Sequence, residues 1–111
     1  MAELQFEPRL THATVSVLQV LLADPERDVY GLEVCTSAGL PTGTVHPIMV
    51  RLLAGGWLDS YWEEGDPKGR GRPLRRYYRL SGEGRARARD AVERAGEKAE
   101  RLRARGKGER R

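Results

Sequence analysis

The chain has 111 residues, of which 39% are hydrophobic and 32% are charged, and its formal net charge is +4. This length fits one small domain and leaves little room for a second. Its unbroken apolar runs are far shorter than the roughly 20 residues that a membrane span needs, and a single cysteine excludes an internal disulfide framework. We therefore expect a soluble protein of the cytoplasm.

Charge divides the chain into two unlike halves. Residues 1–64 carry three basic and nine acidic side chains, a net of −6. Residues 65–111 carry seventeen basic and seven acidic side chains, a net of +10. Clustered positive charge favours a polyanionic partner for the second half. The alternative is a solvated basic tail in a protein from an arginine-rich genome.

Two helices are predicted in the first third of the chain. Thr11 is the candidate N-cap of the first, which runs to residue 23, ends at an Asp-Pro pair and buries Val17, Leu18, Leu21 and Leu22. Asp28 is the candidate cap of the second, over residues 29–37, with the apolar positions Leu32, Val34 and Cys35. Cys35 is expected to be a small buried hydrophobe rather than a redox sensor.

A third helix is predicted from residue 41 or 42 to residue 54. Its buried stripe is Val45, Ile48, Met49, Leu52 and Leu53. Pro47 is tolerable about one turn into this helix, where few intrahelical hydrogen bonds have begun. Gly55 and Gly56 then end it.

A β-hairpin follows. Residues 57–64 and 75–80 are the predicted strands, and the glycine- and arginine-rich residues 65–74 form the loop between them. Leu58 and Trp62 share one face of the first strand, and Tyr61 lies on the other. Trp57 and Trp62 are expected to join strand to helix in the core.

The last predicted element is a long helix capped by Ser81. Its small residues recur at alternating spacings of four and three, which predicts a narrow dimerisation seam formed by Ala88, Val92, Ala95, Ala99 and Leu102. The helix is expected to end near residue 103, with a disordered basic tail over residues 104–111.

The element order is helix, helix, helix, hairpin, long helix. It predicts a mainly α fold with a small β-hairpin, a winged helix-turn-helix followed by a C-terminal dimerisation helix. The expected divisions are an N-terminal arm (1–10), the winged helix-turn-helix (11–80), the dimerisation helix (81–103) and the tail.

In such a fold the third helix enters the major groove and the hairpin loop, or wing, follows the phosphates. Thr42, Thr44 and His46 can meet base edges or phosphates, and Arg51 can reach a phosphate or pair with a carboxylate. The wing cations are Lys68, Arg70, Arg72, Arg75 and Arg76, and interspersed glycines allow close backbone approach. The alternatives are that the threonines only cap the helix and that the loop is merely solvated.

Enzymatic residues are not apparent. His12 and His46 are far apart in the sequence, and neither has an aspartate or cysteine at a suggestive spacing. The sequence also lacks a phosphate-cradling glycine loop followed by lysine and serine or threonine. We predict no catalytic activity, no metal and no cofactor.

Several short motifs, taken in order, resemble the PadR family of bacterial transcriptional regulators over about residues 10–90. They are YGLEV at 30–34, GTVHPI at 43–48, GWL at 56–58, GRP at 71–73, RYYRL at 76–80 and GEG at 82–84. The resemblance implies a winged-helix homodimer that binds a palindromic promoter site, usually as a repressor, with paired C-terminal helices.

Matched onto this chain, the family pattern implies that Tyr30 touches the phosphate backbone. It implies that Thr42, Gly43, Thr44 and His46 lie in or beside the major groove, and that Lys68, Arg70 and Arg72 form the wing. His46 stands where family members usually carry tyrosine, so the base preference is not transferred. Family effectors are often phenolic acids or hydrophobic drugs near the dimer interface; a small aromatic effector stays open here, and the short C-terminal region identifies none.

The resulting hypothesis is a homodimeric, sequence-specific regulator, most simply a repressor, that binds double-stranded promoter DNA in the nucleoid. The alternative is a protein-interaction module whose basic face docks an acidic partner.

Overall fold

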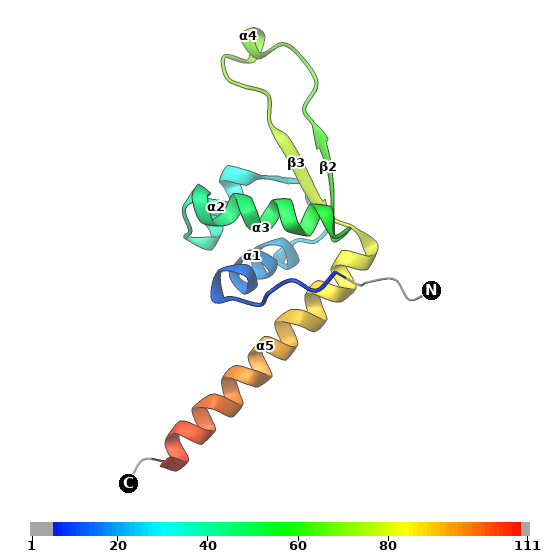
Figure 1. Ribbon diagram of the computed structural model, residues 1–111. Helices are drawn as coiled ribbons and strands as arrows, with labels where there is room; N and C mark the ends of the chain where they lie inside the picture. The colour runs from blue at the N-terminus through cyan, green and yellow to red at the C-terminus, as the bar shows by residue number, and fades with distance from the viewer. Residues whose placement is uncertain (1–5, 110–111) are drawn as a thin grey trace.

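Three helices, a small sheet, a short helix at the hairpin tip and a long C-terminal helix make up the computed structural model, which describes residues 6–109 (Figure 1). The helices and strands, in order, are α1 (His12–Ala23), β1 (Val29–Tyr30), α2 (Gly31–Ala38), α3 (Thr42–Ala54), β2 (Leu58–Trp62), α4 (Pro67–Arg70), β3 (Arg76–Leu80) and α5 (Gly82–Glu109). The β2–β3 hairpin projects from one end of the helical body and α5 from the other, so the molecule measures 65 × 41 × 22 Å. The mainly α winged-helix architecture is confirmed.

The first two helices begin at different kinds of cap. The Thr14 amide donates to Thr11 Oγ1 over 3.1 Å, so the predicted cap of α1 is confirmed. Asp28 does not cap α2, because that helix starts two residues later than expected, at the end of a strand. Instead the Tyr30 amide donates to Glu33 Oε1 over 3.1 Å. Gly39 ends α2 with a φ of 68°, a conformation that favours glycine.

Helix α3 has the bounds that the periodicity predicts. Pro41 is its N-cap residue, and Pro47 lies inside it on the exposed face. Proline at this position removes one intrahelical hydrogen bond, to the Gly43 carbonyl, and Gly43 lies in the exposed first turn. Water can satisfy that carbonyl, so α3 continues through the proline without a break.

The sheet has three antiparallel strands in the order β1-β3-β2. Its central strand β3 pairs Tyr77 with Tyr30 on one side and with Tyr61 on the other. The hairpin is confirmed, with β2 shorter than predicted. Strand β1 was not predicted, because two residues are too few to show an alternating pattern. The short helix α4 at the hairpin tip was also not predicted.

The core lies between α1, α2, α3, the start of α5 and one face of the sheet. Its most deeply buried residues include Leu18, Val34, Met49 and Leu52, as the periodicity predicts. Two predictions are wrong. Leu32 is 64% exposed, because α2 turns that side away from α1, and Trp62 is 60% exposed, because the hairpin carries it beyond the helical body. Trp57 is buried as expected, and the Phe6 ring packs edge-on against it at 5.7 Å.

The end of the hairpin and the start of α5 meet the Trp57 backbone. The Ser81 amide donates to the Trp57 carbonyl over 2.9 Å, and Ser81 Oγ caps α5 by accepting from the Gly84 amide over 2.9 Å. Gly84 is buried here, and a Cβ added to it would lie 1.9 Å from the Trp57 carbonyl oxygen. Only glycine therefore allows α5 to approach this closely.

Helix α5 is longer than predicted. It continues to Glu109, well past the expected end near residue 103. The expected disordered tail is therefore helical for most of its length, while residues 110–111 lie outside the described residues. The expected N-terminal arm is described from Phe6, and residues 1–5 lie outside the described part. Within residues 6–109, none of the helices combines the length and apolar character that a bilayer span requires.

We predict that Gly84→Ala lowers the free energy of unfolding by about 1–3 kcal/mol, because the added methyl group overpacks the contact with Trp57. Gly96→Ala is the matched control in the same helix, since a Cβ there meets nothing within 4 Å. It should raise stability by about 0.5–1 kcal/mol through helix propensity alone. Urea denaturation measures both. Equal effects of the two substitutions would contradict the close approach at Gly84.

Candidate nucleic-acid interface

Helix α3 presents one exposed face along its whole length. The residues on this face follow helical spacing and are Thr42, Gly43, His46, Pro47, Val50 and Arg51. Four of the predicted contact residues, Thr42, Gly43, His46 and Arg51, are thus exposed together. Thr44 is half-buried and faces partly away from them. Neither Thr42 nor Thr44 caps the helix with its side chain, because Pro41 is the N-cap residue.

The first turns of α3 adjoin one face of the hairpin. A shallow pocket of about 210 Å³ lies between α2, α3 and β3, and Leu32, Cys35, Thr42, His46 and Tyr78 contribute to its lining. Cys35 is buried here as expected, and its Sγ lies 3.9 Å from Thr42 Oγ1. Tyr78 itself is buried, on the face of β3 that also carries Arg76.

Two further residues continue this face beyond the body. Arg76 donates through Nε and Nη2 to Ser60 Oγ, over 3.2 and 2.9 Å, and its guanidinium lies 5.8 Å from the Trp62 ring and 5.7 Å from the Tyr78 ring. Trp62 is exposed beside it. The exposed residues of α3, together with Arg76 and Trp62 on the face of the hairpin that also carries the buried Tyr78, are what we call the groove face.

The exposure of Trp62 was not predicted from the sequence. The alternation of apolar and polar residues correctly placed Trp62 on the same strand face as Leu58. The missing information was the length of the hairpin relative to the body, because no helix lies beneath the outer part of β2 (Figure 1).

Tyr30 lies on the opposite face of the sheet from Arg76 and Tyr78. Its ring packs edge-on against Tyr77 at 5.8 Å, and the Arg75 guanidinium lies 3.9 Å above it. Tyr77 in turn stacks on Tyr61 at 5.6 Å. The structure therefore does not bring Tyr30 together with the predicted residues of α3.

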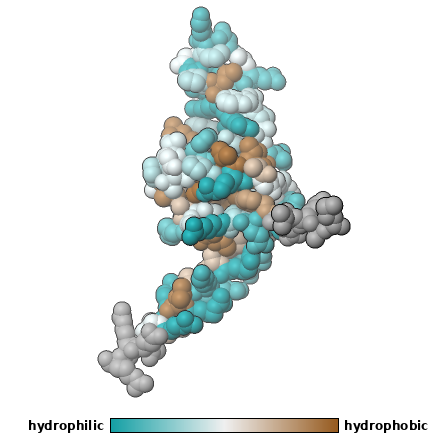
Figure 2. Space-filling view, in the orientation of Figure 1, coloured by the Kyte–Doolittle hydropathy of each residue, from teal (hydrophilic) through white to brown (hydrophobic). Residues whose placement is uncertain are grey.

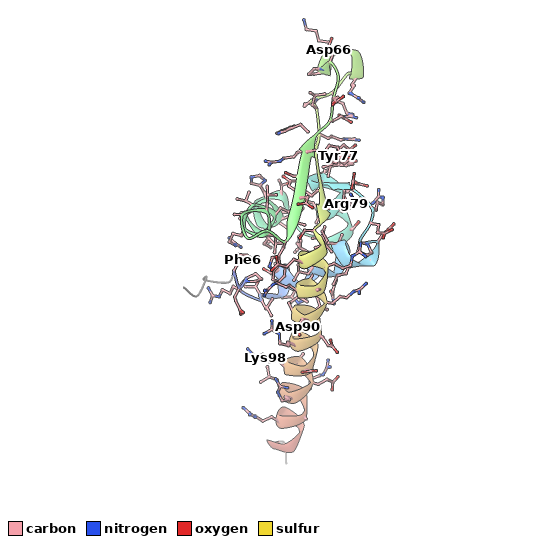
Figure 3. All side chains as sticks on the ribbon, turned by 90° about the vertical axis from the view of Figure 1, so that its right-hand side faces the viewer. Phe6, Asp66, Tyr77, Arg79, Asp90 and Lys98 are labelled. Atoms are coloured by element: carbon pink, nitrogen blue, oxygen red, sulfur yellow. The ribbon has the colours of Figure 1, made fainter. Side chains whose placement is uncertain are left out.

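The tip of the hairpin is hydrophilic (Figure 2). Asp66, labelled at the tip in Figure 3, caps α4 by accepting from the Lys68 amide over 3.0 Å. The Lys68 side chain is exposed on this short helix. Arg70 folds back, and its Nη2 donates to the Glu64 carbonyl over 2.6 Å.

Arg72 is differently placed from Lys68 and Arg70. Its guanidinium donates to both carboxylate oxygens of Glu63, over 2.7 and 3.0 Å, and the Glu63 side chain is only 10% exposed. Arg70 Nη1 lies 3.5 Å from the same carboxylate. The hydrogen bonds from Arg72, with further help from the Arg75 amide and the charge of Arg70, lower the pKa of Glu63 to about 2 against the opposing effect of partial burial.

The predicted seam on α5 divides into buried and exposed parts. Ala88 is fully buried against the core of its own chain, so it is not available to a second subunit, and its assignment to the seam is corrected. Val92 and Ala95 are half-buried, whereas Ala99 and Leu102 are exposed. The latter four line a groove of about 740 Å³ between α5 and α1, together with Leu10 and Val15.

No arrangement for metal chemistry is found in the part of the chain that the structure describes, since no three His, Cys, Asp or Glu side chains are grouped to hold an ion.

Solved structures with the same architecture are known. The protein smu.1704 from Streptococcus mutans UA159 is 21% identical and superposes with a TM-score of 0.67 over 96% of this chain and 98% of its own. A transcriptional regulator from Clostridium thermocellum is 21% identical, with a TM-score of 0.66 over 84% and 88% of the two chains. A PadR family transcription regulator from Clostridium difficile R20291 is 20% identical, with a TM-score of 0.58 over 85% and 93%.

No family model matches the sequence, and no curated protein matches it either. At these identities the likeness establishes the fold. The winged helix predicted from the order of the elements is thereby confirmed as the architecture of this chain.

We predict that the Glu63 carboxyl titrates with a midpoint near pH 2, well below the ordinary glutamate pKa of about 4.3. A lowered pKa means that the pair with Arg72 is complete above the ordinary value and is lost only as the pH falls toward 2. Arg72→Ala should move the midpoint upward. Carboxyl chemical shifts followed by NMR measure both midpoints, and an unchanged midpoint in the variant would contradict the pairing.

Proposed function

We propose that the chain is a sequence-specific regulator of transcription that binds double-stranded DNA as a homodimer. The observation that carries this proposal is the groove face. It joins an exposed helix, of a width that the major groove admits, to a projecting hairpin with a basic tip.

Base recognition is assigned to α3. Thr42 and His46 offer hydrogen-bonding groups at its exposed N-terminal turns, where a recognition helix meets base edges. Val50 and Pro47 offer only apolar contact, for which the thymine methyl group is the complement. Arg51, at the far end of the same face, reaches toward a phosphate.

Affinity is assigned mainly to the hairpin. Lys68 and Arg70 at the tip supply charge to the phosphates, a contribution that is independent of sequence. Arg76 and Trp62 lie between the tip and α3, and present a guanidinium and an exposed indole to the same strand of DNA. The wing thereby fixes the position of the helix that reads the bases.

The dimer is assigned to the groove between α1 and α5. Its apolar residues Ala99 and Leu102 are exposed in the single chain, and a second α5 would cover them. A twofold dimer presents two copies of α3 to half-sites about one helical turn apart, so an inverted repeat is the expected operator. A dimer seated on a promoter blocks access to it, so repression is the proposed effect.

We predict that the protein binds the DNA upstream of its own gene at least ~10³-fold more tightly than a scrambled duplex. His46→Ala should reduce this preference about tenfold or more, because one base contact is worth about 1–3 kcal/mol. Lys68→Ala should weaken binding to both duplexes and make the dependence of log K on log salt shallower by about 0.9. Fluorescence anisotropy across a salt series measures all three effects.

The same series separates the alternatives. Equal, steeply salt-dependent binding to both duplexes would leave a basic DNA-binding module whose operator is elsewhere. Absence of binding to either duplex at low salt would contradict the proposal and favour the module that docks an acidic protein.

We predict that Leu102→Asp raises the dissociation constant of the dimer by about tenfold to a hundredfold. Burial of a leucine contributes about 1.5–3 kcal/mol, and the introduced carboxylate cannot be buried without a partner. Sedimentation equilibrium measures the change.

Ala104→Asp is the matched control for this experiment. It adds the same charge two residues further along α5, at an exposed position outside the groove lining. A wild-type protein that sediments as a monomer, or two variants that dissociate equally, would contradict the groove as the dimer interface.

A further inference from the structure

We propose that Glu63 and Arg72 are positioning residues for DNA binding, and that Arg72 orders the wing by pairing with Glu63 rather than by contacting the DNA. The inference rests on the proposed function, because it concerns how the wing of a DNA-binding protein is held. It also reverses the simplest interpretation of the sequence, in which every wing cation contacts a phosphate.

Glu63 connects the two sides of the wing through both its backbone and its side chain. Its amide donates to the Arg75 carbonyl over 2.8 Å, and its Oε1 accepts from the Arg75 amide over 3.2 Å. Arg72 binds both oxygens of the same carboxylate. One side chain thus joins the end of β2, the approach to β3 and the loop between them.

The loop needs this closure because it has little else to order it. Residues 64–74 include three glycines, and each glycine adds backbone entropy that folding must overcome. Helix α4 has only four residues, too few to be stable without support. None of the four is buried, so no apolar core orders the tip.

Arg72 is poorly suited to bind a phosphate as well. To reach one it would have to leave Glu63, a carboxylate that is 10% exposed and accepts two charge-assisted hydrogen bonds from it. Removing one partner from such a pair leaves a desolvated charge, and the phosphate would bring a second negative charge nearby.

Arg70 is the contrasting case. Its hydrogen bond is to a neutral carbonyl, its distance to Glu63 is 3.5 Å, and its side chain is 41% exposed. It can turn toward a phosphate without leaving a buried carboxylate unpaired. Arg70 and Arg72 therefore have different roles, although they are the same type of residue and lie only two positions apart in the sequence.

The opposite hypothesis is that Glu63 competes with DNA for the two arginines. The two hypotheses predict opposite changes in DNA affinity for the same substitution. Competition requires Glu63→Ala to strengthen DNA binding, because it releases two cations and removes one negative charge. Positioning requires the same substitution to weaken binding, because the tip is no longer held.

The experiment is a double-mutant cycle on duplex DNA, read by anisotropy at fixed salt. Glu63→Ala and Arg72→Ala should each weaken binding about tenfold, and the double variant should be no weaker than either single one, as expected for coupled residues. Arg72→Lys should resemble Arg72→Ala, since a lysine cannot form the two-oxygen pair, whereas a simple phosphate contact would largely survive it.

Glu64→Ala is the matched control, because it removes the same charge from the adjacent, exposed residue. It should leave binding unchanged or slightly tighter. Tighter binding by Glu63→Ala, or effects of the two single substitutions that add in the double variant, would overturn the proposal.

Hydrogen exchange of the free protein gives a readout that needs no DNA. The Arg75 amide, the Arg70 amide of α4 and the amide of Gly71, which ends α4, should exchange faster in Glu63→Ala and Arg72→Ala, but not in Glu64→Ala. Unchanged exchange would overturn the positioning role even where DNA binds. If these amides exchange faster in the two variants but the wild-type protein binds no duplex, the role of Glu63 and Arg72 in ordering the loop would stand and the proposed function would be refuted.

Discussion

The arrangement of this molecule depends on one junction, the contact between the Trp57 backbone and the start of α5. Three connections meet there: the Ser81 amide binds the Trp57 carbonyl, Ser81 Oγ donates to the Gly56 carbonyl over 2.7 Å, and Gly84 lets the helix approach. Helix α3 ends, β2 begins and β3 ends within a few residues of this point. The relative orientation of α3, the hairpin and α5 therefore depends on this junction together with the packing of α5 against α1.

Most of the fold could be predicted because local chemistry and tertiary packing agree. Helices α1 and α3 show the periodicity of one buried face and clear end signals, so their bounds follow from the sequence. Strand β1 has no such signal, since its two residues join the sheet only because β3 offers them a partner. Helix α4 depends on an Asp-Pro start that is as typical of a turn as of a helix.

The candidate site was harder to predict than the fold. A sequence shows that Trp62 alternates with Leu58, but it does not show whether the body extends beneath both. It also counts Arg70 and Arg72 as equal cations, although one faces a carbonyl and the other a carboxylate. The acidic partner lies nine residues before Arg72 and on another element, so no local pattern reveals the pair. Contacts of this kind depend on the register of the hairpin, which spacing alone does not determine.

Ion pairs within the fold change how the charge asymmetry between the two halves of the chain is understood. Several basic residues of the second half are paired with acidic residues of the first: Arg72 with Glu63, Arg79 with Asp28 at 3.4 Å and Arg85 with Glu26 at 3.7 Å. Part of the positive charge is thus neutralised within the chain, where Arg79 and Arg85 join β3 and α5 to the segment before β1. Exposed cations remain at the hairpin tip, on α3 and along α5, among them Lys68, Arg70, Arg51, Arg89, Lys98 and Arg101. Net charge therefore does not show which cations are exposed, because that depends on the pairing within the fold.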